Sequence, residues 1–407
     1  MKLLQLNTVF NSGSTGKIAN AIAMCAYNAG WDSTIAFGRG KKNIVDYTSA
    51  IKIGNNINIL LHGVQTRFFD LHLSGSKIAT INFIRLIKES KPDVIHLHNI
   101  HGYYLNIPIL FDYLKKTNIP VVWTLHDCWP ITGHCCYFDY VKCNKWKSEC
   151  FECPQINSYP SSWFVDNSKK SYEIKKELFS SLPNLTIVTV SDWLKNIVSE
   201  SFLSNIETVV IKNGIDTDIF HPNYDTPQIL KEIKTNYRYT LIGVANVWDR
   251  RKGLKDFIKL RQSLDKSYGI LLVGLTKKQI STLPEGIFGL TRTQNINDLA
   301  SLYSASDIFI NPTHEDNFPT TNLEALACGT PVITYNTGGS PESIDEQTGI
   351  IVEKGNISDL VRAVKQIIES RIFFSKNQCR SRALELYDDS KVFKDYLAVY
   401  DRALKIN

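Results

Sequence analysis

Two carboxylates in the C-terminal half of the chain have a spacing that suits ligand binding. Asp316 lies in a polar loop after the apolar run Ile308–Asn311, and Glu324 lies in the helical pattern that follows. The free N–H groups and positive dipole end of such a helix attract anions. Carboxylates accept hydrogen bonds from hydroxyl groups. The segment from His314 to Glu342 therefore predicts a site for a ligand that carries phosphate and hydroxyl groups.

Glu324 also has an explanation that needs no ligand. Thr321-Asn322-Leu323-Glu324 has the pattern of a capping box, in which the last side chain hydrogen-bonds the start of the helix. From the residues alone, a capping role and ligand binding explain Glu324 equally well. Glu342 is better explained as a first-turn acid that complements a helix dipole.

Three consecutive cations, Arg250, Arg251 and Lys252, stand between the apolar run Tyr239–Val244 and the next helical pattern. Such a cluster is usually solvated surface, but here it separates a strand end from a helix start. A lysine at that point can neutralise the charge that develops on a diphosphate leaving group. We expect Lys252 to bind phosphate, with Arg251 beside it in the same role.

A glycine-rich turn, Ser12-Gly13-Ser14-Thr15-Gly16-Lys17, follows the first apolar run. It is not a Walker A loop, because Asn11 replaces the first glycine and Ile18 replaces the Ser or Thr that follows the lysine. Gly13 and Gly16 are instead expected to let the backbone approach a phosphate at the start of a helix.

Histidines occupy two further apolar runs. His96 and His98 alternate along one run, so they share a face of a strand. Metal binding is one explanation, but lining of a ligand cleft is the better one for His98. His126 and Asp127 end the next run, and an imidazole at a strand end can hydrogen-bond a hydroxyl or a phosphate. We expect His126 to contact the ligand, the alternative being that it only orients its loop.

Six of the nine cysteines lie between Cys128 and Cys153, in a long loop. Cys150 and Cys153 have the spacing of half a tetrahedral zinc site, and Cys135 with Cys143 can complete it. Four thiolates leave no open coordination position, so this zinc would be structural and no catalytic metal is expected. Reduced free thiols and an iron–sulfur site are the alternatives.

These candidate residues follow strands that alternate with helical patterns, which indicates an α/β fold with parallel sheets. Other expected strands are Leu3–Val9, Ser33–Phe37, Leu185–Val190, Gly269–Val273, Val332–Tyr335 and Gly349–Val352. Doubly wound sheets bind ligands beyond the carboxyl ends of their strands, where the candidates fall. We expect two doubly wound domains over 1–205 and 206–388, a cysteine-rich loop over 128–160, and a separate helix over 389–407.

The composition limits the partners of the chain. Its 407 residues are 43% hydrophobic and 21% charged, which is globular. The formal net charge of +6 is dispersed, which suits phosphorylated small molecules or an anionic membrane surface and does not predict nucleic-acid binding. No apolar stretch approaches the roughly 20 residues of a membrane span. We expect a cytoplasmic location, with the cytoplasmic face of the inner membrane left open.

The segment with Asp316 and Glu324 resembles the donor motif of glycosyltransferase family 4, in its bacterial capsule and exopolysaccharide (colanic-acid-type) branch. That motif has two Glu residues separated by seven positions and continues to Gly-x-Pro-Val, so Asp316 replaces the first Glu. Pro319 lacks an N–H group that could bind the donor, and the backbone of Asn317 and Phe318 would supply the remaining ones. The resemblance extends over nearly the whole chain.

The resemblance implies a GT-B fold, with two Rossmann-like domains, an interdomain cleft, and a terminal helix that crosses back to the first domain. It implies a retaining hexosyltransferase that moves a sugar from a nucleotide-diphosphate sugar to a saccharide acceptor, free or lipid-linked, in surface polysaccharide synthesis. In the family, the carboxylates at Asp316 and Glu324 contact the sugar and the ribose, and His126-Asp127 reaches the sugar. The leaving diphosphate helps to deprotonate the acceptor, so the family implies no dedicated protein base.

Two other functions fit the same residues. A GT-B nucleotide-sugar epimerase would release nucleotide diphosphate without an acceptor and would change the sugar. A non-catalytic binding protein with a zinc loop is the second alternative, since Asp316 and Pro319 depart from the family motif. The sequence leaves the sugar, the nucleotide, the acceptor and the linkage open.

Overall fold

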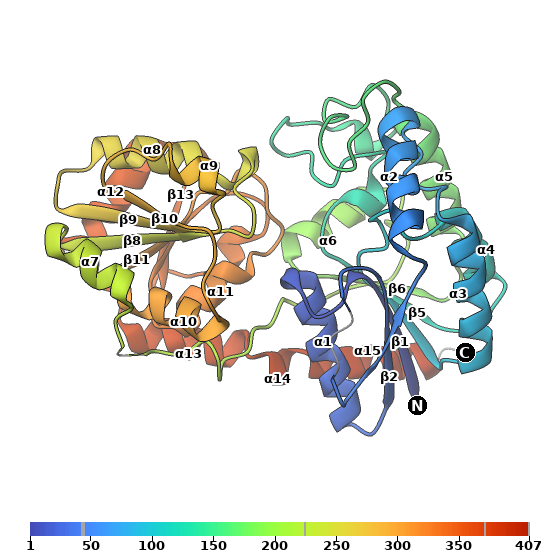
Figure 1. Cartoon of the computed structure of the whole chain (residues 1–407). Helices are drawn as coiled ribbons and strands as arrows, with labels where there is room; N and C mark the ends of the chain where they lie inside the picture. Colours follow the sequence, from blue (N-terminus) through green and yellow to red (C-terminus); the bar gives the residue numbers. More distant parts are fainter. Residues whose placement is uncertain (42–44, 224, 370–371, 406–407) are drawn as a thin grey trace. The chain divides into compact units, whose positions relative to one another are not determined.

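The computed structural model describes residues 1–41, 45–223, 225–369 and 372–405. The chain forms two compact units (Figure 1): unit 1 is Met1–Lys212 with Ser390–Asn407, and unit 2 is Asn213–Asp389. The boundary between them thus follows Lys212 rather than residue 205. The segment from Ser390 belongs to unit 1, and its last two residues lie outside the described part of the chain.

The described part of unit 1 contains a seven-stranded sheet with the order β3-β2-β1-β4-β5-β6-β7, and its neighbouring strands are parallel. The strands are β1 (Lys2–Val9), β2 (Asp32–Arg39), β3 (Ser49–Lys52), β4 (Val94–Leu97), β5 (Val121–Leu125), β6 (Leu185–Thr189) and β7 (Thr208–Val210). The helices are α1 (Gly13–Asn28), α2 (Asn56–Phe69), α3 (Lys77–Ser90), α4 (Ile107–Lys115), α5 (Ser168–Ser180) and α6 (Asp192–Ser199), with α14 (Asp389–Val392) and α15 (Lys394–Lys405) near the C-terminus. Short 3-10 turns, η1 (Trp129–Ile131) and η2 (Lys145–Lys147), lie in the cysteine-rich loop.

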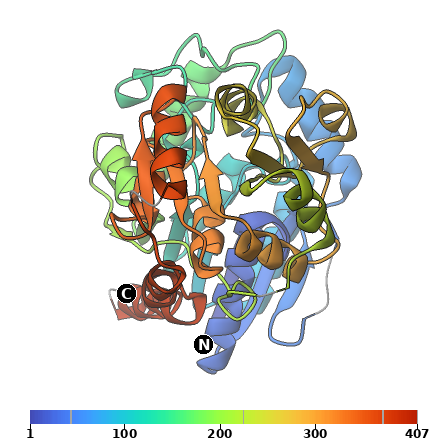
Figure 2. The ribbon, with the colours of Figure 1, turned by 90° about the vertical axis from the view of Figure 1, so that its left-hand side faces the viewer.

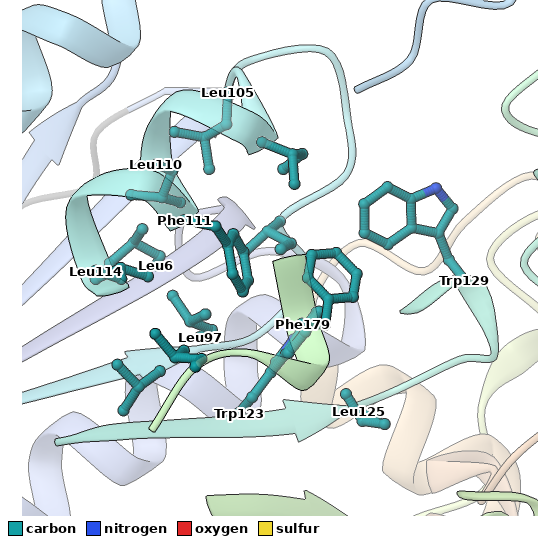
Figure 3. Close-up of a cluster of buried hydrophobic side chains, with 14 of the residues drawn as sticks. Leu6, Leu97, Leu105, Leu110, Phe111, Leu114, Trp123, Leu125, Trp129 and Phe179 are labelled. Atoms are coloured by element: carbon teal, nitrogen blue, oxygen red, sulfur yellow. The ribbon is translucent and has the colours of Figure 1, made fainter. Parts of the chain in front are cut away.

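The core of unit 1 is centred on three aromatic rings (Figure 3). Phe111 of α4 and Phe179 of α5 lie 4.5 Å apart between ring centres, and Trp123 of β5 meets Phe179 edge-on at 4.9 Å. All three side chains are buried, and such aromatic pairs add to the free energy gained from burying their apolar area. This packing holds β5 in place, and the candidate residue His126 follows directly after that strand.

The C-terminal helix completes a second apolar cluster of unit 1. Helix α15 contacts α1 and β5, and its Tyr396 and Tyr400 are buried beside Ile18 and Ile22. The hydroxyl of Tyr400 lies 2.6 Å from Nδ1 of His96 on β4. The red helix can be followed beside the blue α1 in Figures 1 and 2. The terminal helix therefore packs on the first domain, as the family resemblance implies.

The described part of unit 2 contains a six-stranded parallel sheet with the order β10-β9-β8-β11-β12-β13. The strands are β8 (Tyr239–Val244), β9 (Tyr268–Val273), β10 (Ile287–Leu290), β11 (Ile308–Asn311), β12 (Val332–Tyr335) and β13 (Gly349–Val352). The helices are α7 (Gln228–Asn236), α8 (Leu254–Ser263), α9 (Lys277–Ile280), α10 (Ile296–Ala305), α11 (Thr320–Ala327), α12 (Ile357–Ile368) and α13 (Lys376–Leu386), with the 3-10 turns η3 (Arg250–Lys252) and η4 (Ser340–Ser343).

Both sheets have the doubly wound order that the alternating pattern predicts. The strand order reverses between β1 and β4 in unit 1, and between β8 and β11 in unit 2. Crossover connections leave a sheet in opposite directions at such a switch point, and ligands bind beyond the strand ends there. The residues that follow β1, β4, β8 and β11 are therefore the ones to consider for binding.

Candidate active site

In unit 2, two candidate residues meet at the switch point. Lys252 ends η3, which follows β8, and Asp316 lies in the loop after the neighbouring strand β11. Nζ of Lys252 is 2.5 Å from Oδ2 of Asp316, and the two side chains are only 21% and 14% exposed. A charge-assisted contact that is shielded from water in this way is stronger than a surface ion pair. The sequence predicted both residues but not that they pair.

The backbone around Lys252 has a shape that only glycine allows. Gly253 has a φ of +77°, and a Cβ atom there would lie 2.2 Å from the carbonyl oxygen of Pro312. The loop after β11 therefore packs directly against the turn after β8. Asp249 completes the turn because its side chain accepts a hydrogen bond from the N–H of Arg251 at 3.1 Å.

Arg251 joins the two loops rather than pointing freely outward. Its Nε is 3.1 Å from Oδ2 of Asp249, and its guanidinium donates to the carbonyl of Glu315 at 3.2 Å. Its own carbonyl accepts from the N–H of His314 at 2.7 Å. Arg251 thus lies beside the predicted site, where its hydrogen bonds to Glu315 and His314 position the loop that carries Asp316.

The capping-box explanation of Glu324 is wrong. Helix α11 begins at Thr320 with Pro319 as its N-cap, and no side chain caps it. Oε2 of Glu324 instead accepts a hydrogen bond from the hydroxyl of Tyr303 on α10, at 3.0 Å. Burial, together with the carboxylate beside it, raises the pKa of Tyr303 well above its ordinary value. The Tyr303 hydroxyl therefore keeps its proton and orients Glu324.

Asn317 and Phe318 are buried, with 2% and 3% of their surface exposed. The N–H of Asn317 donates to Oδ1 of Asp316 at 3.0 Å, and the carbonyl of Phe318 accepts from the side chain of Asn213 at 2.8 Å. The ring of Phe318 packs against Tyr387 at 5.9 Å. The buried ring of Phe318 therefore holds the loop in place, and the N–H of Asn317 pairs with Asp316 in this structure.

The sequence analysis missed two sets of hydrogen-bonded side chains near the site. Nε2 of His314 lies 2.6 Å from Oδ2 of Asp256 on α8, which also accepts from the hydroxyl of Tyr335 at 3.2 Å. Asn322 bridges Asn311 at the end of β11 to Ser343 of η4, with both contacts at 2.8 Å. The acidic residue Asp256 in the first turn of α8 could be recognised in the sequence, but its partner His314 is 58 positions away in the chain.

In unit 1, His126 is held in place by a chain of hydrogen-bonded side chains that runs through His98 to Gln5. Nδ1 of His98 is 3.1 Å from Nε2 of His126, and Nε2 of His98 is 2.9 Å from Oε1 of Gln5. His98 is 1% exposed, so the expectation that it lines a cleft is corrected: it supports His126 instead. Burial lowers the pKa of His98 well below its ordinary value and that of His126 to about 4. Both imidazoles are therefore neutral near pH 7.

The neighbouring His96 does not form a metal site with His98. Its Nδ1 lies 2.6 Å from the hydroxyl of Tyr400, and its Nε2 lies 2.8 Å from the hydroxyl of Thr124. Both ring nitrogens of His96 are therefore engaged with protein hydroxyl groups.

Asp127 anchors the start of the cysteine-rich loop. Its Oδ2 lies 2.9 Å from Nε2 of His101, and its Oδ1 accepts from the N–H of Trp129 at 2.9 Å. Burial raises the pKa of Asp127, but His101 and the Trp129 N–H outweigh this effect and hold it below its ordinary value. His101, which the sequence analysis missed, thus belongs to this part of the unit.

The glycine-rich turn lies at the switch point of unit 1. Gly13 has a φ of +62° and begins α1, and its N-cap, Ser12, makes no side-chain capping hydrogen bond. A Cβ atom on Gly16 would lie 3.1 Å from Cγ2 of Val9 and 3.3 Å from the N atom of Asn11. Gly16 therefore allows the first turn of α1 to lie close to the end of β1.

The four cysteines predicted to bind zinc surround one small cavity of about 20 Å³. The thiols of Cys135 and Cys153 are hydrogen-bonded to each other, and backbone N–H groups of Gly133 and Gln155 contact Cys150 and Cys153. In the described part of the chain, ligating atoms come within 4.8 Å of one another in the sets Asp70, His72, His134 and His101, Asp127, Cys136. The four cysteines are spaced more widely than such a set.

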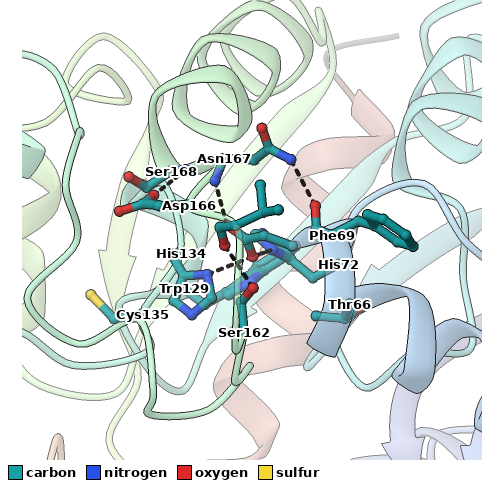
Figure 4. Close-up of polar contacts among 12 residues, drawn as sticks. Thr66, Phe69, His72, Trp129, His134, Cys135, Ser162, Asp166, Asn167 and Ser168 are labelled. Atoms are coloured by element: carbon teal, nitrogen blue, oxygen red, sulfur yellow. Dashed lines mark hydrogen bonds and ion pairs between the residues drawn. The ribbon is translucent and has the colours of Figure 1, made fainter.

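Polar contacts fix the two ends of the cysteine-rich loop (Figure 4). Asp70 at the end of α2 receives Nδ1 of His134 at 2.7 Å and the N–H of Asn167 at 2.9 Å. The N–H of Ser168 donates to Asp166 at 2.8 Å where α5 begins. The loop is therefore attached to α2 and α5 by hydrogen bonds at both ends of the cysteine cluster.

Two family models cover most of the chain. The model of glycosyl transferases group 1 matches residues 225–385, and that of Glycosyltransferase Family 4 matches residues 29–219. The putative colanic acid biosynthesis glycosyl transferase WcaC of Escherichia coli is 25% identical over 421 residues, which span 98% of this chain and 99% of WcaC. The N,N'-diacetylbacillosaminyl-diphospho-undecaprenol alpha-1,3-N-acetylgalactosaminyltransferase of Campylobacter jejuni is 25% identical over 60% of this chain and 69% of its own length.

Solved structures show the same architecture. Sucrose-phosphate synthase of Thermosynechococcus elongatus matches with a TM-score of 0.73 at 16% identity, and the match spans 100% of this chain and 100% of the synthase. HepE of Anabaena in complex with UDP-glucose has a TM-score of 0.68 at 14% identity, over 99% of this chain and 100% of HepE. The fold is therefore GT-B, and the protein is a glycosyltransferase. The chain belongs to glycosyltransferase family 4, which confirms the family predicted from the segment with Asp316 and Glu324.

Proposed function

We propose that the protein is a retaining hexosyltransferase that moves a sugar from a nucleotide-diphosphate sugar to a lipid-linked saccharide in surface polysaccharide synthesis. The observation that carries this proposal is the pair Lys252–Asp316 at the switch point of unit 2. The names of relatives support it, because one concerns colanic acid biosynthesis and another a diphospho-undecaprenol-linked acceptor. The lipid-linked acceptor would place the protein at the cytoplasmic face of a membrane.

In the proposed donor complex, the diphosphate replaces Asp316 as the partner of Lys252. The lysine then neutralises charge on the leaving group, and Asp316 becomes able to accept a hydrogen bond from the sugar. Glu324, oriented by Tyr303, accepts hydrogen bonds from the ribose hydroxyls. The neutral imidazole of His126 hydrogen-bonds a hydroxyl of the reacting saccharide.

Retention follows from departure and attack on the same face of the sugar. The bond from the anomeric carbon to the diphosphate oxygen breaks while the bond to the acceptor oxygen forms. The acceptor proton passes to the departing diphosphate, whose negative charge makes it the base. The protein residues then bind, orient and stabilise charge, and no covalent intermediate with the protein forms.

A donor-hydrolysis assay with UDP-, GDP- and CMP-sugars tests this function. We expect one donor class to be hydrolysed, and NMR of the product to show the anomeric configuration of the donor. Lys252→Met should lower kcat by about 10²- to 10³-fold, as expected for loss of a charge-stabilising group. The matched control is Lys255→Met, an exposed lysine in the following helix α8, which should retain activity.

Two results would count against the proposal. Inverted product would remove the retaining mechanism, and absence of binding or hydrolysis with every donor class would remove the transferase itself. The epimerase alternative predicts nucleotide diphosphate release together with a changed sugar. Recovery of the unchanged sugar from the donor therefore separates the two enzymes.

We further propose that Cys135, Cys143, Cys150 and Cys153 bind one structural zinc ion. Their side chains line one cavity of about 20 Å³, which is about the space of one small ion or water. N–H contacts to Cys150 and Cys153 would stabilise thiolates there. Nζ of the fully buried Lys175 donates to the carbonyls of Trp129 and Thr132 at 2.7 and 2.9 Å beside this loop, and burial lowers the pKa of Lys175 to about 7. Zinc binding would draw the sulfur atoms closer together than they are in this structure.

Elemental analysis of protein purified without added zinc tests this site. We expect close to one zinc per chain in the wild type and in Cys25→Ser, since Cys25 lies in α1 outside the loop. Cys150→Ser should lose most of the metal. A folded wild-type chain without zinc would contradict the proposal, and iron with visible absorbance would favour the iron–sulfur alternative.

A further inference from the structure

Helix α2 presents its apolar side to solvent. Ile57, Leu60, Leu61, Val64 and Phe68 follow one another at the spacing of a single helix face, and they are 40–66% exposed. The residues that face the interior are His62, Gly63 and Thr66, which are polar or small. A surface helix normally has the opposite arrangement, with its apolar stripe against the core. An exposed apolar stripe of this size marks an interaction surface.

Aromatic side chains extend this surface at the C-terminal end of α2. Phe68 lies 5.5 Å from Trp163 and 5.5 Å from Phe164 between ring centres. Phe69, Trp163 and Phe164 are 54–73% exposed, so the rings pack against one another while remaining open to solvent. Exposed Trp and Phe beside an apolar helix face are typical of segments that lie in a membrane interface. We call this set of residues on α2, with Trp163 and Phe164, the α2 surface.

A cationic pocket opens beside the α2 surface. It has a volume of about 370 Å³, and its lining includes Arg39, Arg67, Asn56, Leu60 and Tyr103. The guanidinium of Arg39 lies 5.1 Å from the centre of the Tyr103 ring, and that of Arg67 lies 5.8 Å from Trp163. Within the described residues, neither arginine forms an ion pair with a carboxylate, and Nε of Arg39 is buried without a hydrogen-bond partner.

Charge identifies the occupant of this surface. Helix α2 contains no acidic residue, and neither arginine of the pocket forms an ion pair with a carboxylate in the described part of the chain. Guanidinium groups bind phosphate oxygens with good geometry. A protein partner would cover the apolar stripe, but it would not explain a cationic pocket next to it. A lipid satisfies both features, because its phosphate lies next to its acyl chains.

We propose that the α2 surface docks on an anionic membrane, with the pocket of Arg39 and Arg67 holding a phosphate-bearing lipid headgroup. This inference rests on the proposed function in one respect: it gives the lipid-linked acceptor a place to bind on unit 1. Helix α2 lies in the interface plane, and its apolar stripe enters the boundary between headgroups and acyl chains. Within the described residues, no helix is long and apolar enough to cross a membrane.

Vesicle co-sedimentation of the full chain tests the proposal. We expect binding to phosphatidylcholine vesicles that contain phosphatidylglycerol, and much weaker binding to phosphatidylcholine alone. Ile57→Ser with Leu61→Ser should weaken binding at least about tenfold, because two exposed apolar side chains lose their burial in lipid. Arg39→Gln with Arg67→Gln should remove most of the preference for anionic lipid.

Matched variants in unit 2 provide the controls. Val247→Ser with Ile351→Ser also replaces exposed apolar residues, and Arg292→Gln replaces an exposed arginine, and all should bind as the wild type does. The thermal unfolding midpoint of each variant shows whether it folds. If the Arg39 variant does not fold, Arg67→Gln alone still tests the pocket, since that side chain is exposed.

Four outcomes would overturn the proposal. The first is wild-type chain that stays in the supernatant with anionic vesicles, and the second is serine variants that sediment with them as well as the wild type does. Self-association of the wild type that the serine variants abolish, without vesicle binding, would assign the surface to a second copy. Equally tight binding of inorganic pyrophosphate without vesicles would assign the pocket to a soluble phosphate. Donor hydrolysis by the wild type is measured in parallel, so loss of the transferase proposal and loss of the lipid proposal are separate results.

Discussion

At the scale of single residues, the candidate active site consists of pairs whose members come from different elements. Lys252 pairs with Asp316, and Tyr303 pairs with Glu324. In each pair, one member holds the other in a defined orientation before any ligand binds. For Tyr303 and Glu324, this preorganisation lowers the cost of forming the proposed donor complex, whereas the contact between Lys252 and Asp316 is exchanged for one with the diphosphate. The second pair gives Glu324 a fixed direction that a helix cap would not have given it.

Tyr303→Phe should lower kcat/KM for the donor by about tenfold to a hundredfold. The variant keeps the packing of the ring and removes the hydroxyl that donates to Glu324, and hydrogen bonds to charged groups contribute about 1.5–3 kcal/mol. Tyr268→Phe, at another buried tyrosine of unit 2, is the control and should have little effect. Unchanged kinetics in Tyr303→Phe would mean that Glu324 needs no orienting partner.

The sequence identified most of these residues but few of their contacts. Lys252, Asp316, Glu324 and His126 were recognisable because polar groups directly after strands fall at the ligand-binding edge of a parallel sheet. Tyr303 was not, because it looks like an ordinary core residue within a helix. The burial of His98 was also hidden, since it depends on side chains from β1 and β5 that pack around β4.

At the scale of elements, the central strands and the edge strand β13 were predictable from the sequence, and the edge strands β3, β7 and β10 were not. The core strands β4, β5 and β6 are buried along their whole length, so each appears as a continuous apolar run. The edge strands β3, β7 and β10 are short and partly exposed, so they lack such a run. The turn from β8 into α8 has its own requirement, because Gly253 combines a left-handed backbone with close packing.

Gly253→Ala should destabilise unit 2 by more than a left-handed conformation alone would. An L-residue in that conformation costs about 1–2 kcal/mol, and the added Cβ would also overlap the carbonyl oxygen of Pro312 at 2.2 Å. Gly355→Ala is the matched control, since its φ is +79° but a Cβ there meets only His314 at 3.8 Å. Thermal unfolding should give a lower midpoint for Gly253→Ala. Equal midpoints would show that the loop after β11 moves away at little cost.

At the scale of the whole molecule, buried histidines link stability to pH. Burial lowers the pKa of His62 and of His126 to about 4, and that of His96 and His98 well below the ordinary value of 6.5. The unfolded chain therefore takes up protons at these histidines below about pH 6.5, whereas folded His62 and His126 do not bind them until about pH 4. The stability that neutral burial preserves at pH 7 is lost as the pH falls through this range.

The free energy of unfolding of unit 1 should decrease between about pH 6.5 and pH 4. Each such histidine contributes up to about 1.4 kcal/mol per pH unit. Urea unfolding at several pH values measures this slope, and His62→Asn should flatten it. His221→Asn removes an exposed histidine and should leave the slope unchanged. A stability that is constant down to pH 4 would contradict the neutral, buried state of these side chains.

The return of the C-terminal segment to unit 1 has a consequence for the order of events during translation. All of unit 2, Asn213–Asp389, is synthesised before α15 emerges, and α15 supplies Tyr400 to a partner on β4 that is 304 positions earlier. Domains generally fold as units while the chain grows. Unit 1 begins to be synthesised first, but the apolar surface of α1 and β5 stays uncovered until α15 has been made. Unit 2 is synthesised later, but all the strands of its sheet are present before α15 is made. A released chain that ends before Lys394 should therefore contain a protease-resistant unit 2 and a still incomplete unit 1.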